Sequence, residues 1–207
     1  MRKNIYGVHY TKSGMYTILS LMKEIELKIL NVDVPAMRRK LKKLGLKRVM
    51  KPTLLHEIHF ISENFRGKGS RASLFRLRKE GGRSFLTVKA KRRKDKRFDV
   101  RQETEVSVSD FEKTKKILEA VGFKILRERE KFREEYKGKG VKVEIDSYPK
   151  IKPYAEVEGN DKKTVLKFLS TLGYSLKDTT NKTATGVLKE AGIGDGKLVF
   201  KKQKEKI

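Results

Sequence analysis

Hydrophobic and polar residues alternate with a period of two in many short stretches of this chain. Residues 84–91 show it clearly, because every second residue from Leu86 to Ala90 is apolar and Thr87 and Lys89 stand between them. Successive side chains of a β-strand point to opposite faces, so this period predicts strands. We predict about eight strands, at 23–31, 54–61, 73–78, 84–91, 101–105, 131–135, 141–146 and 154–159.

Three further stretches have helical spacing and end in the same way. Each closes with a leucine, two other residues, an apolar residue, a glycine and a second apolar or aromatic residue, at 41–46, 118–123 and 169–174. The glycine suits the left-handed conformation that ends many helices. At the other end, Pro35 suits the first turn of the first helix. Ser109 with Glu112 forms a capping-box pattern before the second helix, and Asn160 or Asp161 can cap the third.

These elements predict an α+β fold with a mainly antiparallel sheet, because the strands are interrupted by helices rather than alternating with them. Nearly every predicted strand has one apolar face and one ionic face. A strand of this kind ordinarily exposes its ionic face to solvent, and that alternative stays open. The helices also need apolar surface to cover. We therefore expect the apolar faces to point outward and the charged faces to line a closed or nearly closed β-barrel.

Composition narrows the function classes. The chain of 207 residues has no cysteine, which excludes disulfides and thiolate metal sites. No apolar run is long enough to span a bilayer, so we expect a cytoplasmic protein without membrane contact. The 52 lysines and arginines against 26 acidic residues give a net charge of +26, which attracts polyanions. An RNA-associated module is one alternative, although the basic residues are spread along strands and no aromatic stacking platform is evident.

The sharply patterned part of the chain defines its organisation. We predict an N-terminal extension at 1–21, one domain at 22–193 and a basic C-terminal tail at 194–207. Nucleic acid is not required as a partner, although the basic surface could attract it, and a homodimer is left open.

The ionic faces are segregated by charge. The acidic set is Glu24, Glu26, Asp146, Glu156 and Glu158, and the basic set is Lys28, Arg76, Arg78, Lys89, Lys131 and Arg133. Carboxylate oxygens are preferred ligands of Mg²⁺ and Mn²⁺. Arginine and lysine hold phosphate oxygens. An acidic set beside a basic set therefore suits a complex of a divalent cation with a polyphosphate.

The order of these residues resembles the CYTH superfamily, the triphosphate tunnel metalloenzymes. Its Glu-x-Glu-x-Lys signature is met by Glu24, Glu26 and Lys28. The other matches follow in order from the arginine strand to the closing acidic residues: Arg76-x-Arg78, the lysine strand with Lys89, Arg101 with Glu103 and Glu105, Lys131-x-Arg133 with Tyr136, Asp146, and Glu156-x-Glu158. The resemblance covers roughly residues 22–193. One departure concerns the second strand, where cyclase-like members often carry Gln-x-Asp-x-Tyr and this chain has Leu55, Glu57 and His59.

The resemblance implies an antiparallel tunnel with polar residues inside, which binds a triphosphate end-on with one or two divalent cations, Mg²⁺ or Mn²⁺. It assigns metal binding to Glu24, Glu26, Asp146, Glu156 and Glu158. It assigns triphosphate binding to Lys28, Arg76, Arg78, Lys89, Lys131 and Arg133, of which Lys28, Lys89 and Arg133 are expected to act in catalysis.

The reaction is left open between three alternatives. The pattern is most like a class IV adenylyl cyclase, which converts ATP to cyclic AMP and pyrophosphate. The second alternative is a triphosphatase that hydrolyses thiamine triphosphate or inorganic tripolyphosphate. The third is a protein that binds a triphosphate or RNA without turnover.

Overall fold

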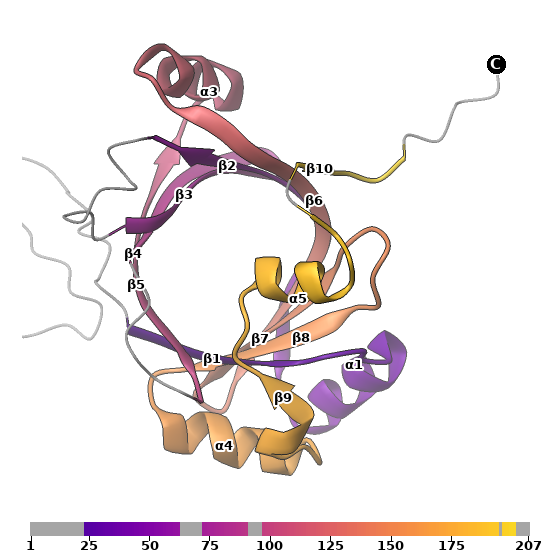
Figure 1. Ribbon diagram of the computed structural model, residues 1–207. Helices are drawn as coiled ribbons and strands as arrows, with labels where there is room; N and C mark the ends of the chain where they lie inside the picture. The colour runs from indigo at the N-terminus through magenta and orange to yellow at the C-terminus, as the bar shows by residue number, and fades with distance from the viewer. Residues whose placement is uncertain (1–22, 63–71, 91–96, 195, 202–207) are drawn as a thin grey trace, which may run out of the picture.

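The computed structural model describes residues 23–62, 72–90, 97–194 and 196–201. Within these residues, eight strands form a ring: β1 (Lys23–Ile29), β2 (Lys47–Ile61), β3 (Ala72–Glu80), β4 (Arg83–Ala90), β5 (Asp99–Val108), β6 (Lys124–Gly138), β7 (Val141–Ser147) and β8 (Tyr154–Gly159). The pairing order is β6-β2-β3-β4-β5-β1-β8-β7, and β7 pairs with β6 again. All of these pairings are antiparallel. Figure 1 looks along the ring, and the predicted closed or nearly closed antiparallel barrel is confirmed.

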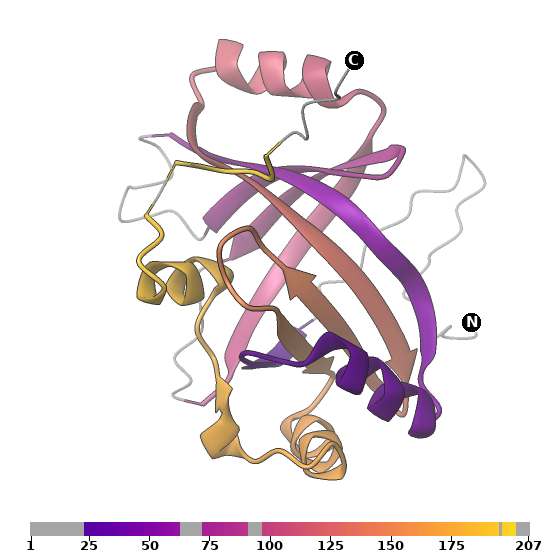
Figure 2. The same ribbon diagram turned by 90° about the vertical axis from the view of Figure 1, so that its right-hand side faces the viewer.

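The hydrophobic core lies outside this ring. One cluster joins the apolar face of β1, including Leu27, to Leu41 of α1 (Val34–Lys43) and Leu169 of α4 (Lys162–Thr171). A second cluster joins β2 and β3 to α3 (Phe111–Ala120). Figure 2 shows α3 across one wall of the ring and α1 and α4 along the opposite wall. The prediction that the apolar strand faces point outward to the helices is confirmed, because burying those faces requires helices on the outside.

The helix ends follow local sequence rules, with one correction. At the predicted glycines, Gly45, Gly122 and Gly173 have φ between 79° and 91°. Behind each, an amide donates to the carbonyl five residues earlier, such as Leu46 N to Leu41 O at 3.0 Å, which is the Schellman geometry. The predicted cap at Ser109 is wrong by one residue, because Asp110 is the cap. The carboxylate of Asp110 accepts a hydrogen bond from the Lys113 amide at 2.9 Å.

A fourth described helix, α5 (Ala184–Glu190), was not predicted. Its seven residues are too few for a helical period to stand out. Its end nevertheless repeats the pattern of the other three, because residues 188–193 read Leu-Lys-Glu-Ala-Gly-Ile and the Ile193 amide donates to Leu188 O at 2.9 Å. In Figure 1, α5 stands at the near mouth of the ring. It packs there through a third cluster that contains Tyr148, Tyr154 and Leu188.

The two longest strands, β2 and β6, both begin well before the residues that the alternation indicated. β2 starts at Lys47 rather than residue 54, and its first eight residues are half-buried or exposed. Shifts in its register with β6 occur between Arg48 and Thr53, so the period of two is broken there. β6 starts at Lys124 rather than residue 131.

Part of the predicted C-terminal tail forms a short strand. Residues 197–198 form β10 (Lys197–Leu198), which pairs parallel to β6, and two apolar side chains attach it. Leu198 is buried, and the Phe200 ring lies 5.0 Å from the Phe132 ring, centre to centre. The predicted extension at 1–21 lies outside the described residues.

The turn between β3 and β4 allows a matched test of the backbone. Gly81 has φ 56°, whereas Gly82 has no positive φ, and neither would bring a Cβ within 4 Å of another atom. A left-handed conformation costs a residue with a Cβ about 1–2 kcal/mol. We expect Gly81→Ala to lower the free energy of unfolding by about 1 kcal/mol, and Gly82→Ala to leave it nearly unchanged. Equal losses in urea denaturation would contradict this assignment.

Candidate functional site

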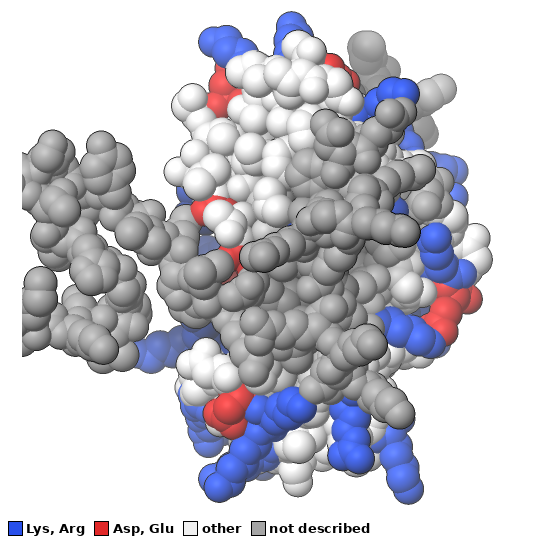
Figure 3. All heavy atoms as spheres, turned by 60° about the vertical axis from the view of Figure 1, so that its left-hand side comes forward, with Lys and Arg blue, Asp and Glu red and all other residues white. Residues whose placement is uncertain are grey.

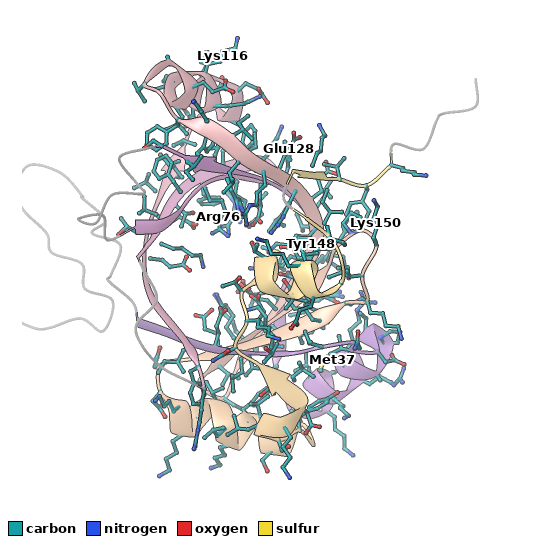
Figure 4. The ribbon with its side chains drawn as sticks, viewed as in Figure 1. Met37, Arg76, Lys116, Glu128, Tyr148 and Lys150 are labelled. Atoms are coloured by element: carbon teal, nitrogen blue, oxygen red, sulfur yellow. The ribbon has the colours of Figure 1, made fainter. Side chains whose placement is uncertain are left out.

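The inside of the ring is ionic. Charged residues with at most 8% of their surface exposed come from five of the ring strands: Lys28, Glu57, Arg76, Glu80, Arg129, Lys131, Arg133, Glu134, Glu144 and Asp146. All of them except Glu134 lie on the inward face of their strand. Figure 4 shows Arg76 inside the ring and Met37 outside it, between α1 and the wall of the ring. Buried charges are costly unless they are paired, so this interior is organised by ion pairs.

Lys28 joins two predicted metal ligands. Its ammonium lies 2.5 Å from Glu26 Oε1 and 3.2 Å from Glu156 Oε1. The sheet register explains the contact, because Lys28 stands opposite Glu156 and Glu26 stands opposite Glu158 on β8. Burial opposes the charge on Lys28, but Glu156 and Glu26 raise its pKa above the ordinary value. Lys28 is therefore a fixed positive charge in the centre of the acidic set.

The carboxyl groups of the acidic set are crowded, and their pKa values move in opposite directions. Burial would raise the pKa of Glu26, but Lys28 and Lys89 lower it to about 2. In contrast, burial raises the pKa of Glu156 to about 7, and Glu26 and Asp146 add to this rise although Lys28 opposes it. Glu156 is one cause of the lowered pKa of the neighbouring Glu144, and Arg133 pairs with both carboxyl groups. The shared cation lets these two acids stay close together inside the ring.

This donor chemistry fits a hard divalent cation, which prefers carboxylate oxygens. Glu26, Glu156 and Glu158 lie on adjacent strands in paired register positions. Glu158 is 2.7 Å from Lys142 Nζ. Among the described residues, no three carboxylate or imidazole groups already converge as metal ligands. The carboxylates would therefore exchange a lysine or arginine contact for a metal ion.

Asp146 links the acidic set to the basic set. It is fully buried, and Arg133 contacts both of its oxygens at 2.6 Å. Lys131 Nζ lies 2.9 Å from Asp146 Oδ2 and 3.7 Å from Glu57 Oε1. Arg133 also pairs with Glu144 and, at 3.3 Å, with Glu156. The carboxylate of Asp146 thus fixes the positions of two predicted phosphate-binding groups.

The other basic residues come from β3 and β4. Arg76 contacts Glu57 at 3.3 Å, and Arg78 contacts Glu105 at the same distance. Lys89 pairs with Glu103 of β5. Its positive charge also helps to lower the pKa of Glu26 on the neighbouring strand β1. The structure therefore brings all six predicted phosphate-binding residues to the ring interior.

This basic part has hydrogen-bonding capacity to spare. Within the described residues, Arg76 Nε and both ring nitrogens of His59 are buried without a hydrogen-bond partner. Burial and the neighbouring Arg76 lower the pKa of Arg78, which is the effect of crowding like charges away from water. Buried polar groups ordinarily find partners. These groups are suited to the oxygens of an anion.

The sequence did not reveal every interior residue. Glu57 and Glu144 are buried among the arginines and lysines but were not assigned a role. Arg127 and Arg129 of β6 both donate to Thr185 Oγ1 of α5, at 2.6 and 2.9 Å. The alternation Arg127-x-Arg129-x-Lys131-x-Arg133 is the signal that could have placed these two arginines beside the predicted pair.

Two predicted positions are described only in part. Glu24 lies in β1 opposite Arg101 of β5, but the structure does not describe either side chain. The predicted role of Glu24 as a metal ligand stays a prediction.

Positive charge also gathers on the outer surface around α4. α4 exposes Lys162, Lys163 and Lys167, and Figure 3 shows lysines and arginines projecting around this lower end of the molecule. A field of this sign draws anions toward the protein. Among the described residues, no helix is long and apolar enough to cross a membrane.

An antiparallel strand ring with ionic groups inside and helices outside defines a tunnel-type α+β protein. Residues 22–184 match the CYTH domain family, so the chain belongs to this family. A Methanocaldococcus jannaschii protein named "putative adenylate cyclase" is 33% identical over 139 residues, which cover 66% of this chain and 77% of that protein.

Two solved structures resemble the fold. A Pyrococcus horikoshii protein matches with a TM-score of 0.65 at 26% sequence identity. The match covers 77% of this chain and 96% of the Pyrococcus horikoshii chain. A Hippeastrum protein described as a "putative adenylyl cyclase" matches with a TM-score of 0.58 at 16% sequence identity. The match covers 84% of this chain and 97% of the Hippeastrum chain.

Proposed function

We propose that this chain is a divalent-metal-dependent enzyme that cleaves a triphosphate inside the tunnel. One observation carries the proposal. The interior holds an acidic set of crowded carboxyl groups directly beside a basic set in which, among the described residues, Arg76 Nε and Arg78 Nε have no hydrogen-bond partner. A divalent cation and a triphosphate would satisfy both at once.

The residues divide the work by position. Glu24, Glu26, Glu156 and Glu158 would hold Mg²⁺ or Mn²⁺, which when bound neutralises phosphate charge and orients the attacking oxygen. Asp146 accepts hydrogen bonds from Lys131 and Arg133 on its two oxygens. It would therefore orient these two side chains toward the phosphates. Lys28, Lys89 and Arg133 stabilise negative charge as it grows on the phosphate oxygens. Because Asp146 and Glu103 hold Arg133 and Lys89 in advance, these two side chains need little reorganisation.

Two reactions compete for this site. The Methanocaldococcus jannaschii relative is named for adenylate cyclase, and in that reaction a ribose hydroxyl attacks the α-phosphate and pyrophosphate leaves. The Hippeastrum protein is described as having a dominant triphosphatase activity, and in that reaction water attacks the terminal phosphate.

The second strand favours hydrolysis. Glu57 and His59 occupy the positions where cyclase-like members often carry Asp and Tyr. Here both are buried next to Arg76, which lies 3.3 Å from Glu57. These side chains therefore face the basic set, and a substrate without a nucleobase would suffice.

Product analysis tests the function and the metal requirement together. ATP, thiamine triphosphate and tripolyphosphate are incubated separately with the protein and Mg²⁺ or Mn²⁺, with EDTA as the control. We expect orthophosphate from at least one substrate, no product with EDTA, and full recovery when metal is restored. Cyclic AMP with pyrophosphate would assign the cyclase reaction instead. No product with either metal, together with salt-sensitive RNA binding, would contradict the proposal.

A further inference from the structure

Two of the outer helices carry positive charge that no acidic residue within them offsets. α1 has five basic residues and no acidic residue among its ten, and α4 has three basic residues and no acidic residue among its ten. α3, on the opposite wall, contains Glu112 and Glu119. The apolar faces of α1 and α4 are buried against one wall of the ring (Figure 2). Their basic side chains are therefore left on the outer surface.

The turn between β6 and β7 lies between these two helices. A Cβ on Gly138 would come within 3.3 Å of Leu46, just after α1, and a Cβ on Gly140 would come within 3.4 Å of Thr164 in α4. Lys139 stands between the two glycines and is exposed. The cations of α1, of α4 and of this turn therefore belong to one surface.

The backbone of this turn is strained at Lys139. Its φ is 53°, in the left-handed region. A residue with a Cβ is less stable than glycine in that conformation, and glycine or asparagine is the ordinary choice in a tight hairpin turn. The lysine therefore lowers stability and adds only a charge at the surface, which favours a role for that charge.

Five exposed cations of this surface have no acidic partner. No ion pair joins them to a carboxylate in the part of the chain that the structure describes. Arg39 is three and four residues from Lys42 and Lys43, a spacing at which like charges destabilise a helix. A polyanion would relieve this repulsion. We call the five residues the basic belt: Arg39, Lys42, Lys43, Lys139 and Lys167.

The chemistry around the belt selects among polyanions. The large apolar side chains that are exposed in the described residues all lie outside α1 and α4, so these helices lack the apolar face with which a surface helix enters a membrane. The ring of Tyr174 beside them is half-buried, and the Lys40 ammonium lies 5.0 Å from its centre. It offers no open face on which a base of a single strand could stack. Point charges alone suit the phosphates of a duplex.

We propose that the basic belt binds double-stranded nucleic acid through its phosphate backbone, without reading the bases. Each contact between a belt cation and a phosphate releases counterions, so the affinity falls steeply as salt rises. The belt lies outside the ring, and the inference does not depend on the proposed function.

Fluorescence anisotropy with a labelled DNA duplex tests the belt. The duplex has hydroxyl 5′ ends, so it presents no triphosphate to the tunnel. Five phosphate contacts predict a slope of about −4.5 for the logarithm of the association constant against the logarithm of salt concentration. Two duplexes of unrelated sequence should bind equally. Stronger binding of a single strand of the same length, or binding of phosphatidylserine vesicles without binding of the duplex, would overturn the proposal.

Variants of the belt test its residues directly. Arg39→Gln, Lys42→Gln and Lys43→Gln are combined in one triple variant, which should reduce the magnitude of the slope by about 2.7. Lys139→Gly should reduce it by about 0.9 and raise the Tm, because glycine relieves the left-handed strain. This second variant keeps the test valid if the triple variant does not fold. An unchanged slope in folded Lys139→Gly and in the folded triple variant would overturn the belt.

The matched control removes the same charge from the opposite wall. Lys113→Gln, Lys115→Gln and Lys116→Gln are combined on α3, and this variant should keep the slope of the wild type. Equal changes of slope in the two triple variants would show general charge attraction and would overturn the belt.

Turnover of triphosphates with Mg²⁺ is measured on the same proteins, and the belt variants should keep it. If the duplex binds as expected but no triphosphate is cleaved, the proposed function fails and the belt stands. If triphosphate is cleaved but the duplex does not bind, the belt fails and the proposed function stands.

Discussion

Glu26→Gln is expected to lower metal-dependent turnover by about a thousandfold, because bound metal contributes several kcal/mol of charge stabilisation at about 1.4 kcal/mol per tenfold in rate. The amide keeps the shape of the side chain but loses the charge that a hard cation requires. Lys28 keeps its second partner, since Glu156 Oε1 lies 3.2 Å from its ammonium. We therefore expect the fold to survive, as checked by circular dichroism and thermal denaturation.

The matched control is Glu119→Gln on α3, which removes an exposed carboxylate away from the ring. This variant should keep full activity. Direct titration of Mn²⁺ in the presence of triphosphate should show weaker metal binding for Glu26→Gln alone. Full activity in folded Glu26→Gln would exclude this residue from the metal site.

Arg133→Met is expected to destabilise the protein by about 3–5 kcal/mol, because it leaves buried carboxylates without their cation. Arg133 contacts Glu144, Asp146 and Glu156, and all three lose this partner together. For a domain of this size the loss corresponds to a fall in Tm of roughly 10 °C. Thermal denaturation at neutral pH measures it.

A second substitution tests the electrostatic cause. Asp146→Asn in the Arg133→Met background removes one of the stranded charges and should restore about 1–2 kcal/mol. Arg83→Met is the control for losing an arginine, because its side chain is 71% exposed and Glu80 keeps a contact with Arg78. A Tm within about 2 °C of the wild type for Arg133→Met would show that the buried pairs contribute little.

The sequence predicted the ring because two local signals agreed. Alternation gave each strand an apolar and an ionic face, and three glycine-terminated helices needed apolar surface to cover. Together they required the inverted arrangement that the structure has, with the core outside and the charges inside. The CYTH resemblance was carried by residues such as Lys28 and Arg76, which the fold brings to one interior.

The misses have physical causes. β2 begins early because its bulged, exposed first half breaks the period of two. α5 is too short to show a helical period, so the contact of Thr185 with Arg127 and Arg129 could not be foreseen. The role of Glu57 depends on pairing across β2, β3 and β6, which brings Arg76 and Lys131 to one carboxylate from different parts of the chain.

The most direct test of the account is the position of metal and triphosphate in the protein. Crystals grown with Mn²⁺ and a non-hydrolysable triphosphate would show the metal by its anomalous scattering. We predict one or two metal peaks at Glu26, Glu156 and Glu158, with the phosphates against Lys28, Arg76 and Arg133. Metal and triphosphate bound together on the outer basic surface, with the interior ion pairs intact, would contradict the account.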